Sequence, residues 1–386
     1  MKATADFLDR LAESERLRVL DLLDRAFDDD IYSSNTRNAF FRGYKSQSPN
    51  VVLLHAARDL AGVAIVGTRT IQMAGVQVKA LTIGPLAIDP LFQKRGFSKL
   101  LMDGIDELAA DLGALVAYLV GTPGFYRRYG YYPVLARTKV SLKTETIPSF
   151  HGVEVHPFHE QYLPEMTELF RVNAQMYSCA SQRTEGDWEW LTRHGRDTYY
   201  FYNPHVVLLN HQVVGYFCSD SRTPGRIREA LHGTDDNAMS SFLDGLKQFA
   251  PGEEISMLEV MTPANSPLHE YLRRGKDAIF TESIQSDGGQ LMKVCDVEEL
   301  LGQVQTANRR ENPDVVQNQR MRPRPSSRLA SQEGGISLLT DELIPGVLSG
   351  YIRTGTAQVH EDDVDVEAPF SQFSSQTPFI YQGDNF

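Results

Sequence analysis

The first half of the chain consists of short apolar runs followed by one long amphipathic run. Three of the short runs have the length and composition of β-strands, and they cover residues 51–57, 62–73 and 76–88. The turn signals Arg58-Asp59 and Ala74-Gly75 separate them, which predicts an antiparallel meander. Before the meander, apolar positions at mostly helical spacing predict a helix within residues 6–27.

The amphipathic run after the meander predicts a helix that ends at a glycine. Its apolar residues form one helical face: Phe97, Leu100, Leu101, Ile105, Leu108 and Leu112. Gly113 stands where a C-terminal cap is expected. A buried-looking strand follows at residues 114–120. Because a helix separates this strand from the strand 76–88, we expect the two to pair in parallel.

The second half of the chain repeats this order of elements. The pattern predicts a hairpin around Asn210-His211 (205–220), a helix (236–249), a strand (254–262), a short helix (266–274) and a final hairpin (277–296). The stretch "VGTPGFYRRYG" in the first half is echoed by "VMTPANSPLHEYLRRG" in the second. We interpret the repeat as a diverged internal duplication.

The last part of the chain has a different character. Residues 303–334 are polar, basic and proline-containing without periodicity, as in a linker or loop. Residues 335–352 predict a strand and a helix capped near Thr340 or Asp341, and the aromatic end 378–386 predicts a docked terminus. The predicted divisions are therefore residues 1–150, 151–302, 303–334 and 335–386.

The composition is that of a globular protein with sizeable cores. With 386 residues, 41% of them hydrophobic, the chain is long enough for two or three domains. The first residues lack the apolar run of a signal peptide, and no stretch approaches the roughly 20 apolar residues of a membrane span. A cytoplasmic protein without a membrane partner is therefore expected. Three distant cysteines predict unpaired thiols, and ten scattered histidines without ligand spacing predict no metal.

The net charge of −12 argues against nucleic acid as the main partner. An acidic protein attracts cationic small molecules, although the need for solubility alone also accounts for the charge.

A basic, glycine-containing turn lies between the strand 76–88 and the following helix. The start of a helix presents unpaired N–H groups and the positive end of its dipole, and a glycine lets a phosphate approach the backbone. Lys94 and Arg95 add positive charge before Gly96. Such a turn can hold a diphosphate. On the turn alone, however, an ordinary glycine turn with solvated basic side chains is the simpler interpretation.

The wider context of this turn resembles the GNAT family of acetyl-CoA-dependent N-acetyltransferases. The run Gln93-Lys94-Arg95-Gly96-Phe97-Ser98 matches the family's Q/R-x-x-G-x-G/A loop, with Ser98 in place of the usual Gly or Ala. The stretch "GTPGFYRRYGYYP" matches the segment that ends the family's acetyl-CoA groove. The resemblance implies a mixed α/β fold with central mixed sheets and flanking helices.

The chain as a whole resembles the enhanced-intracellular-survival (Eis) type of this family. Proteins of this type carry an active GNAT domain, a second GNAT domain without the diphosphate loop and a C-terminal sterol-carrier-protein-like domain. Residues 176–191 resemble the opening of the second domain and residues 290–301 its exit. The stretch after Leu301 is short, so we expect the third, α+β unit to be abbreviated. The resemblance also implies a homo-oligomer, a hexamer being one such state.

The resemblance assigns a cofactor site to the end of the strand and the turn after it. Backbone groups of Leu86, Ala87 and Ile88 would hold the pantetheine arm of acetyl-CoA, and the loop residues would hold its diphosphate. The break at Ile83–Pro85 suits a bulge that opens such a groove, although an edge-strand irregularity would look the same. The N–H of Leu86 would polarise the thioester carbonyl.

Tyr126 matches the tyrosine that serves as general acid in the Eis type. A phenol has a pKa of about 10 and a thiol about 8.5, so Tyr126 stays protonated at neutral pH and can donate to a departing thiolate. A packing role among neighbouring aromatics is the alternative.

In the Eis type, the C-terminal carboxylate assists deprotonation of the amine, which here assigns that role to Phe386. A terminal carboxylate with a pKa of about 3.5 is ionised at neutral pH and can orient the ammonium group. A loosely ordered tail is the alternative.

Three functional hypotheses follow. The first is an N-acetyltransferase that uses acetyl-CoA to modify amines of small, cationic molecules. The second is an acetyltransferase of protein lysines or N-termini, and the third is a non-catalytic acyl-CoA-binding scaffold.

Asp28-Asp29-Asp30 could lie near the amine entrance or form a helix-end charge cluster.

Overall fold

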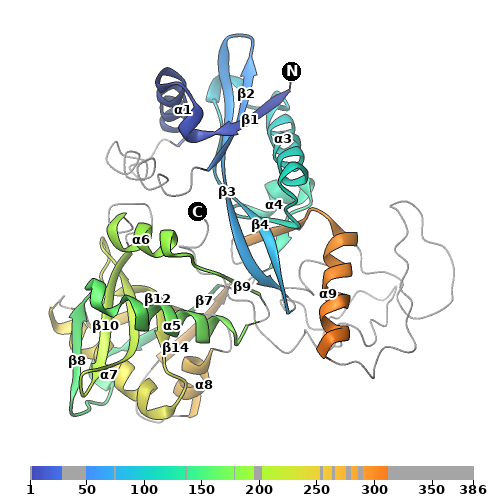
Figure 1. Cartoon of the computed structure of the whole chain (residues 1–386). Coiled ribbons are helices and arrows are strands. Elements are labelled where there is room, and N and C mark those ends of the chain that lie inside the picture. Colours follow the sequence, from blue (N-terminus) through green and yellow to red (C-terminus); the bar gives the residue numbers. More distant parts are fainter. Residues whose placement is uncertain are drawn as a thin grey trace, which may run out of the picture.

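The computed structural model describes the chain in segments up to Glu311. The described residues are 2–27, 49–73, 75–134, 137–177, 179–194, 202–252, 255–262, 266–274, 280–285 and 290–311. Two mixed sheets with flanking helices lie one above the other, and the long strands β3 and β4 reach from the first toward the second (Figure 1). The mixed α/β fold class is thereby confirmed.

The first sheet has the order β1-β2-β3-β4-β5-β15-β6, with β9 also paired to β3. Its strands are β1 (Ala3–Phe7), β2 (Asn50–Ala56), β3 (Asp59–Met73), β4 (Val76–Ile88), β5 (Val116–Val120), β6 (Tyr132–Pro133), β9 (Cys179–Ser181) and β15 (Gln290–Val294). The antiparallel meander β2-β3-β4 is confirmed. The parallel pairing of β4 with β5 is also confirmed.

Helices cover both faces of the first sheet. The helix α3 (Phe97–Leu112) packs on the face that carries Leu81 and Ile83. The next residues toward the start of β4, Val78 and Ala80, point to the other face, where α9 (Val297–Glu311) packs. The helix α1 (Glu13–Ala26) covers a third cluster under β2 and β3.

The chain start differs from the predicted helix over residues 6–27. Residues 3–7 form strand β1, which pairs with β2 in antiparallel register, and the α-helix begins only at Glu13. Leu8, directly after β1, is buried in the core next to β2 and β3. Its apolar side chain therefore reflects packing against the sheet, and it is not part of the apolar face of an α-helix.

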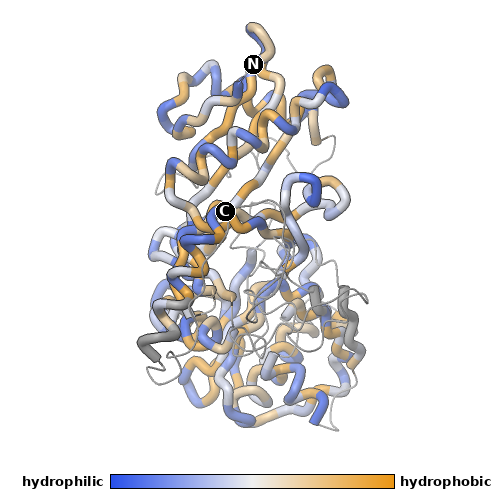
Figure 2. Tube along the Cα trace, turned by 90° about the vertical axis from the view of Figure 1, so that its right-hand side faces the viewer, coloured by the Kyte–Doolittle hydropathy of each residue, from blue (hydrophilic) through white to orange (hydrophobic). Residues whose placement is uncertain are grey.

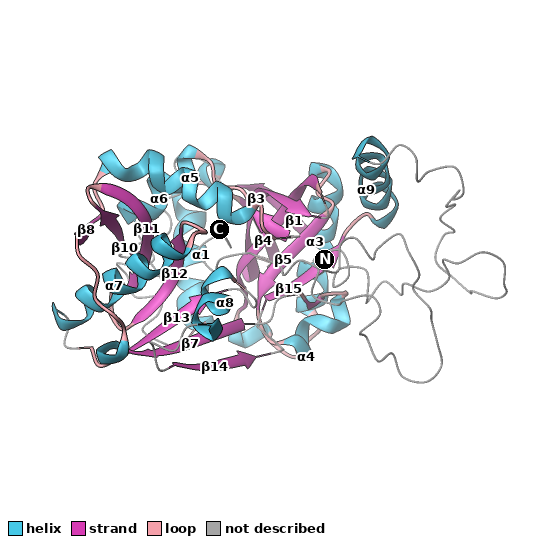
Figure 3. Ribbon diagram, turned by 90° about the horizontal axis from the view of Figure 1, so that it is seen from below, coloured by secondary structure: helices cyan, strands magenta, loops and turns pink. Residues whose placement is uncertain are grey.

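The second sheet has the order β14-β7-β13-β12-β11-β10-β8. Its strands are β7 (Arg137–Lys143), β8 (Val153–Pro157), β10 (Tyr202–Leu209), β11 (Gln212–Asp220), β12 (Arg226–His232), β13 (Met257–Thr262) and β14 (Phe280–Gln285). Strands β13, β7 and β14 lie side by side at one edge (Figure 3). The hairpin β10-β11 around Asn210 and His211 is confirmed, and both turn residues have positive φ.

The helices of this part are α5 (Leu163–Ala174), α6 (Glu185–His194), α7 (Asp236–Gly252) and α8 (Pro267–Arg274). The predicted helices at 236–249 and 266–274 are thus confirmed. A parallel pair, β12·β13, again follows a strand–helix–strand order. Hydrophobic and hydrophilic positions alternate along the trace (Figure 2), and buried apolar residues from strands and helices form the cores of both parts.

The predicted hairpin over residues 277–296 is wrong. Strand β14 pairs with β7 in the second sheet, whereas β15 pairs with β5 and β6 in the first. Leu291 and Met292 of β15 are fully buried in two cores of the first sheet, which a surface hairpin could not offer them.

Sheet membership also crosses the predicted boundary at residue 150, because β7 lies before it and belongs to the second sheet. The division of the chain into domains stays a prediction. Residues 303–311 of the expected linker are helical within α9, and the remaining C-terminal predictions lie outside the described residues.

Candidate active site

Strands β4 and β5 separate at the point where the sequence breaks. Their parallel register runs from Ala80 opposite Val116 to Ile83 opposite Leu119 and then stops, while β4 continues to Ile88. In the ladder with β3, the register also shifts between Ile83 and Leu86, across Gly84-Pro85. Beyond Ile83, the edge of β4 that faces β5 therefore has no strand partner in the described part of the chain.

The turn after β4 is fixed by a buried carboxylate. Asp89 is 3% exposed. Its carboxylate accepts hydrogen bonds from the Leu91 N–H at 2.9 Å and from the Arg25 guanidinium of α1 at 2.6 and 3.1 Å. The Gln93 amide donates to the Ile88 C=O at 3.2 Å. These contacts set the point from which the basic loop starts.

The basic loop leads into an uncapped helix start. The side chains of Gln93, Lys94 and Arg95 are exposed, and Lys94 and Gly96 have φ of 60° and 82°. Gly96 is the N-cap of α3 and supplies no side-chain hydrogen bond. Apart from the Lys99 N–H, which donates to the Gly96 C=O at 3.1 Å, the first N–H groups of α3 are therefore available to an anion, with two cationic side chains beside them.

The corresponding helix of the second sheet begins differently. The Asp235 carboxylate accepts a hydrogen bond from the Ala238 N–H at 2.9 Å, and Asp236 is the first residue of α7. A carboxylate occupies the place of an anion there, and negative charge opposes a diphosphate. Of these two helix starts, only that of α3 suits an anionic ligand.

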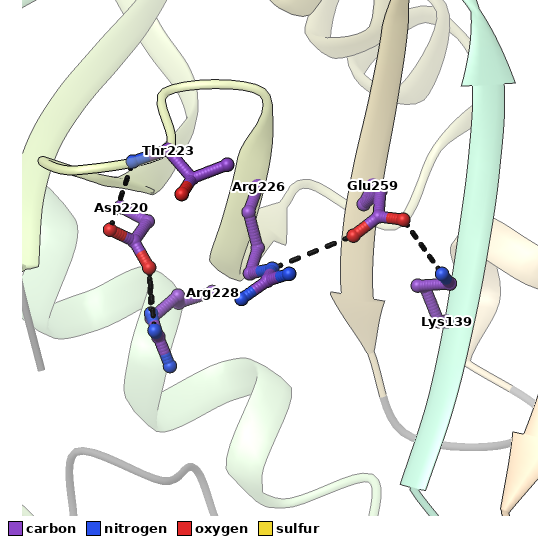
Figure 4. A network of polar contacts seen from close by, with 6 residues as sticks. All are labelled: Lys139, Asp220, Thr223, Arg226, Arg228 and Glu259. Carbon is purple, nitrogen blue, oxygen red and sulfur yellow. Dashed lines mark hydrogen bonds and ion pairs between the residues drawn. The ribbon is translucent and has the colours of Figure 1, made fainter.

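Near the parallel pair β12·β13, charged side chains of the second sheet are paired with side chains of opposite charge (Figure 4). Asp220 accepts hydrogen bonds from the Arg228 side chain at 2.5 and 2.9 Å and from the Thr223 N–H at 3.2 Å. Glu259 lies 2.7 Å from the Lys139 ammonium and 3.5 Å from the Arg226 guanidinium. We interpret this network as support for the sheet.

Tyr126 closes the short helix α4 (Pro123–Tyr126), directly after β5. Its N–H donates to the Thr122 C=O, and its ring packs edge-on against Phe125, with centroids 4.8 Å apart. Burial raises the pKa of Tyr126 to about 12, and the neighbouring Tyr129 adds to the shift. The phenol therefore keeps its proton throughout the physiological range.

Strand β15, from a much later part of the chain, supports residues 122–131, which we call the aromatic turn. The Lys293 ammonium of β15 lies 2.7 Å from both carboxylate oxygens of Asp106 on α3 and 5.9 Å from the centroid of the Tyr131 ring. Burial raises the pKa of Tyr131 well above its usual value. No local sequence pattern points to Lys293 and Asp106, because the two residues lie 187 positions apart.

The fold brings four of the predicted site residues to one apolar cluster. Leu86, Ile88, Phe97 and Tyr126 pack against it, and Tyr129 packs beside them. Ala87 points to the opposite face, toward α1. The Ser98 hydroxyl, which replaces the usual Gly or Ala, hydrogen-bonds the Tyr129 hydroxyl at 2.9 Å.

Several predicted features lie elsewhere. Phe386 and Asp28-Asp29-Asp30 lie outside the described residues. Within the described segments, no group of three or more His, Cys, Asp and Glu side chains is arranged to hold a metal ion. Among the helices described, none is long and apolar enough to cross a membrane.

A comparison with protein families identifies the kind of domain that contains this site. Residues 8–134 match the family model of the acetyltransferase (GNAT) domain. These residues form a GNAT acetyltransferase domain. The protein is therefore an acyltransferase, and the open β4 edge, the basic loop, α3 and Tyr126 all lie within the GNAT domain.

Solved structures share the fold over most of the chain. A conserved protein of unknown function from Enterococcus faecalis V583, described as a probable N-acyltransferase, has 14% identity and a TM-score of 0.63 over 78% of this chain and 75% of its own. A GCN5-related N-acetyltransferase from Anabaena variabilis has 16% identity and a TM-score of 0.61 over the same shares. Eis1 from Mycobacterium abscessus has 15% identity and a TM-score of 0.55, again over 78% and 75%. No curated protein matches the chain.

Proposed function

We propose that the protein is an N-acetyltransferase that moves the acetyl group of acetyl-CoA to amines of small, cationic molecules. The observation that carries the proposal is the convergence of three features on one apolar cluster. These are the open edge of β4, the uncapped basic start of α3 and the partly buried Tyr126.

In the proposed complex, acetyl-CoA lies along β4 and across the start of α3. The pantetheine arm hydrogen-bonds the backbone of Leu86, Ala87 and Ile88 in the manner of an added strand. The loop from Gln93 to Ser98 holds the diphosphate through backbone N–H groups and the charges of Lys94 and Arg95. No such loop precedes α7, which supports a second GNAT-like unit without a cofactor site.

The proposed reaction is direct attack of the neutral amine on the thioester carbonyl carbon. The new C–N bond forms as the C–S bond breaks, and the Leu86 N–H stabilises the developing oxyanion. Tyr126 gives its proton to the departing thiolate, and the proton lost by the amine leaves through water beside the carboxylate of Phe386. The tyrosine regains a proton from solvent, so the enzyme returns to its starting state.

The acceptor and the assembly are the remaining parts of the proposal. The net charge of −12 favours a cationic acceptor. We include in the proposal the tandem arrangement and the abbreviated sterol-carrier-protein-like C-terminal unit that the resemblance of the sequence to the Eis type implies. We extend the proposal to a cytoplasmic homo-oligomer, with a hexamer as one candidate state.

The test is release of free thiol from acetyl-CoA by the purified protein with a panel of amines. We expect Tyr126→Phe to lower kcat about 100-fold or more, as for loss of a general acid, and deletion of Phe386 alone to lower it strongly. Tyr162→Phe, which removes a distant hydroxyl, serves as the matched control. Unchanged turnover without Phe386 would remove the terminal carboxylate from the mechanism.

The alternatives give different results in the same assay. Turnover with lysine-containing peptides but none of the small amines would indicate a protein acetyltransferase. Acetyl-CoA binding without turnover on any amine or peptide would indicate a scaffold.

A further inference from the structure

A hydroxyl pair joins the turn that carries Tyr126 to the first turn of α3. Ser98 is the second residue of α3, and its Oγ lies 2.9 Å from the hydroxyl oxygen of Tyr129. Tyr129 ends the 3-10 turn Arg127–Tyr129 that follows α4 directly. The contact therefore links the anion-binding loop to the aromatic turn through side chains alone.

The aromatic turn is hydrogen-bonded within itself. The Tyr126 N–H donates to the Thr122 C=O, and the Tyr131 N–H donates to the Tyr126 C=O, both at 3.3 Å. The Phe125 ring packs against both Tyr126 and Tyr129, with centroids 4.8 and 5.6 Å away. Tyr129 and Tyr126 are therefore joined through the Phe125 ring that both contact and through the short stretch of backbone between them.

The other partner of the pair lies in the turn that receives the diphosphate. The backbone N–H of Ser98 is among those that a helix start leaves without an intrahelical acceptor. An anion bound there restrains the backbone of Ser98. The Ser98 side chain, at the same time, holds Tyr129, so that restraint extends to the aromatic turn.

We infer that Ser98 and Tyr129 are positioning residues whose hydroxyl pair couples occupation of the diphosphate loop to the placement of the Tyr126 hydroxyl. The inference rests on the proposed function for its catalytic consequence. Both residues act indirectly in this scheme, since Ser98 acts on Tyr129 and Tyr129 acts on Tyr126. The serine that departs from the family's Gly or Ala thus gains a specific role in this chain.

Steady-state kinetics of the full chain provide the first test. We expect Ser98→Ala and Tyr129→Phe each to lower kcat about three- to tenfold, with little change in the KM for acetyl-CoA. The double variant loses no more than either single one, because both remove the same contact. Ser98→Thr retains the hydroxyl and keeps most of the wild-type kcat, and Tyr162→Phe again serves as the control.

Two kinetic results would overturn the inference. Wild-type kcat in both single variants would show that the pair has no positioning role. A loss confined to the KM for acetyl-CoA would show that Ser98 only binds the cosubstrate.

Hydrogen exchange with coenzyme A gives a readout that does not need turnover. Coenzyme A should slow amide exchange of residues 122–131 in the wild type, whereas Ser98→Ala should bind coenzyme A without this protection. Equal protection in both proteins, or none in the wild type despite binding, would refute the coupling. Absent binding would defeat this inference and the proposed function together. Protection in a wild type without turnover would count against the proposed function alone.

Discussion

At the scale of single residues, its surroundings give Tyr126 a property that matters for the proposed chemistry. Burial, with a smaller contribution from Tyr129, raises the pKa of the partly buried phenol to about 12. An acid whose pKa is raised stays protonated to a higher pH, so Tyr126 is a persistent proton donor. Its neighbour Tyr131 is fully buried, and burial raises the pKa of that phenol as well.

The raised pKa predicts the shape of the pH–rate profile. Activity should rise with pH as the amine loses its proton, and kcat should show no fall due to Tyr126 up to about pH 10, two units below the point at which the phenol ionises. The measurement is kcat at saturating substrates from about pH 6 to pH 10. An alkaline fall near pH 8.5 that is present in the wild type and absent in Tyr126→Phe would contradict the assignment.

At the scale of elements, helix α3 begins and ends with a glycine in the left-handed region. Gly96 precedes its first residue with φ of 82°, and Gly113 follows its last residue with φ of 62°. A Cβ added at either position meets nothing within 4 Å, so steric contact does not distinguish them. Substitutions at the two glycines can therefore be compared to separate an effect on stability from an effect on cofactor binding.

We predict that Gly96→Ala and Gly113→Ala lower stability similarly, by about 1 kcal/mol each, because alanine disfavours positive φ. Only Gly96→Ala should also raise the KM for acetyl-CoA, by about fivefold or more, since it changes the anion-binding loop. Urea unfolding measures the first effect, and steady-state kinetics measure the second. An equal rise in KM for Gly113→Ala would show that the loop has no special role.

At the scale of the whole molecule, the two sheets are built from interleaved parts of the chain. The first sheet receives β9 and β15 from after residue 150, and the second receives β7 from before it. Arg69 of β3 and Asp187 of α6 form an ion pair between the two parts, with each side chain no more than 12% exposed. The GNAT domain is thus completed by later segments.

This interleaving predicts that the first 150 residues cannot fold alone. The fragment would lack β15 and α9, exposing the core faces that Met292 and Leu300 bury. We expect it to be insoluble or to unfold without a cooperative transition, whereas a chain ending at Glu311 retains every described element and unfolds cooperatively. Urea denaturation followed by circular dichroism checks both, and a cooperative transition in the short fragment would show that β15 is dispensable.

The sequence by itself determined the elements whose signals are local. The strand β4, the basic loop, α3 with its glycine end, β5 and the aromatic turn follow one another along the chain, and each has its own periodicity or turn residue. Because the candidate cofactor site is built from these consecutive elements, the resemblance to the GNAT family could assign its residues along the sequence, and their role in binding stays a prediction.

Tertiary structure alone decided which sheet each later strand joins and which side chains meet. The apolar pattern of residues 280–294 fits a hairpin as well as two separate strands, since period-two alternation does not specify the partner. Likewise, the pairs Ser98–Tyr129 and Asp106–Lys293 depend on where the chain returns in space. Burial of apolar surface drives that return, and it acts without regard to distance along the sequence.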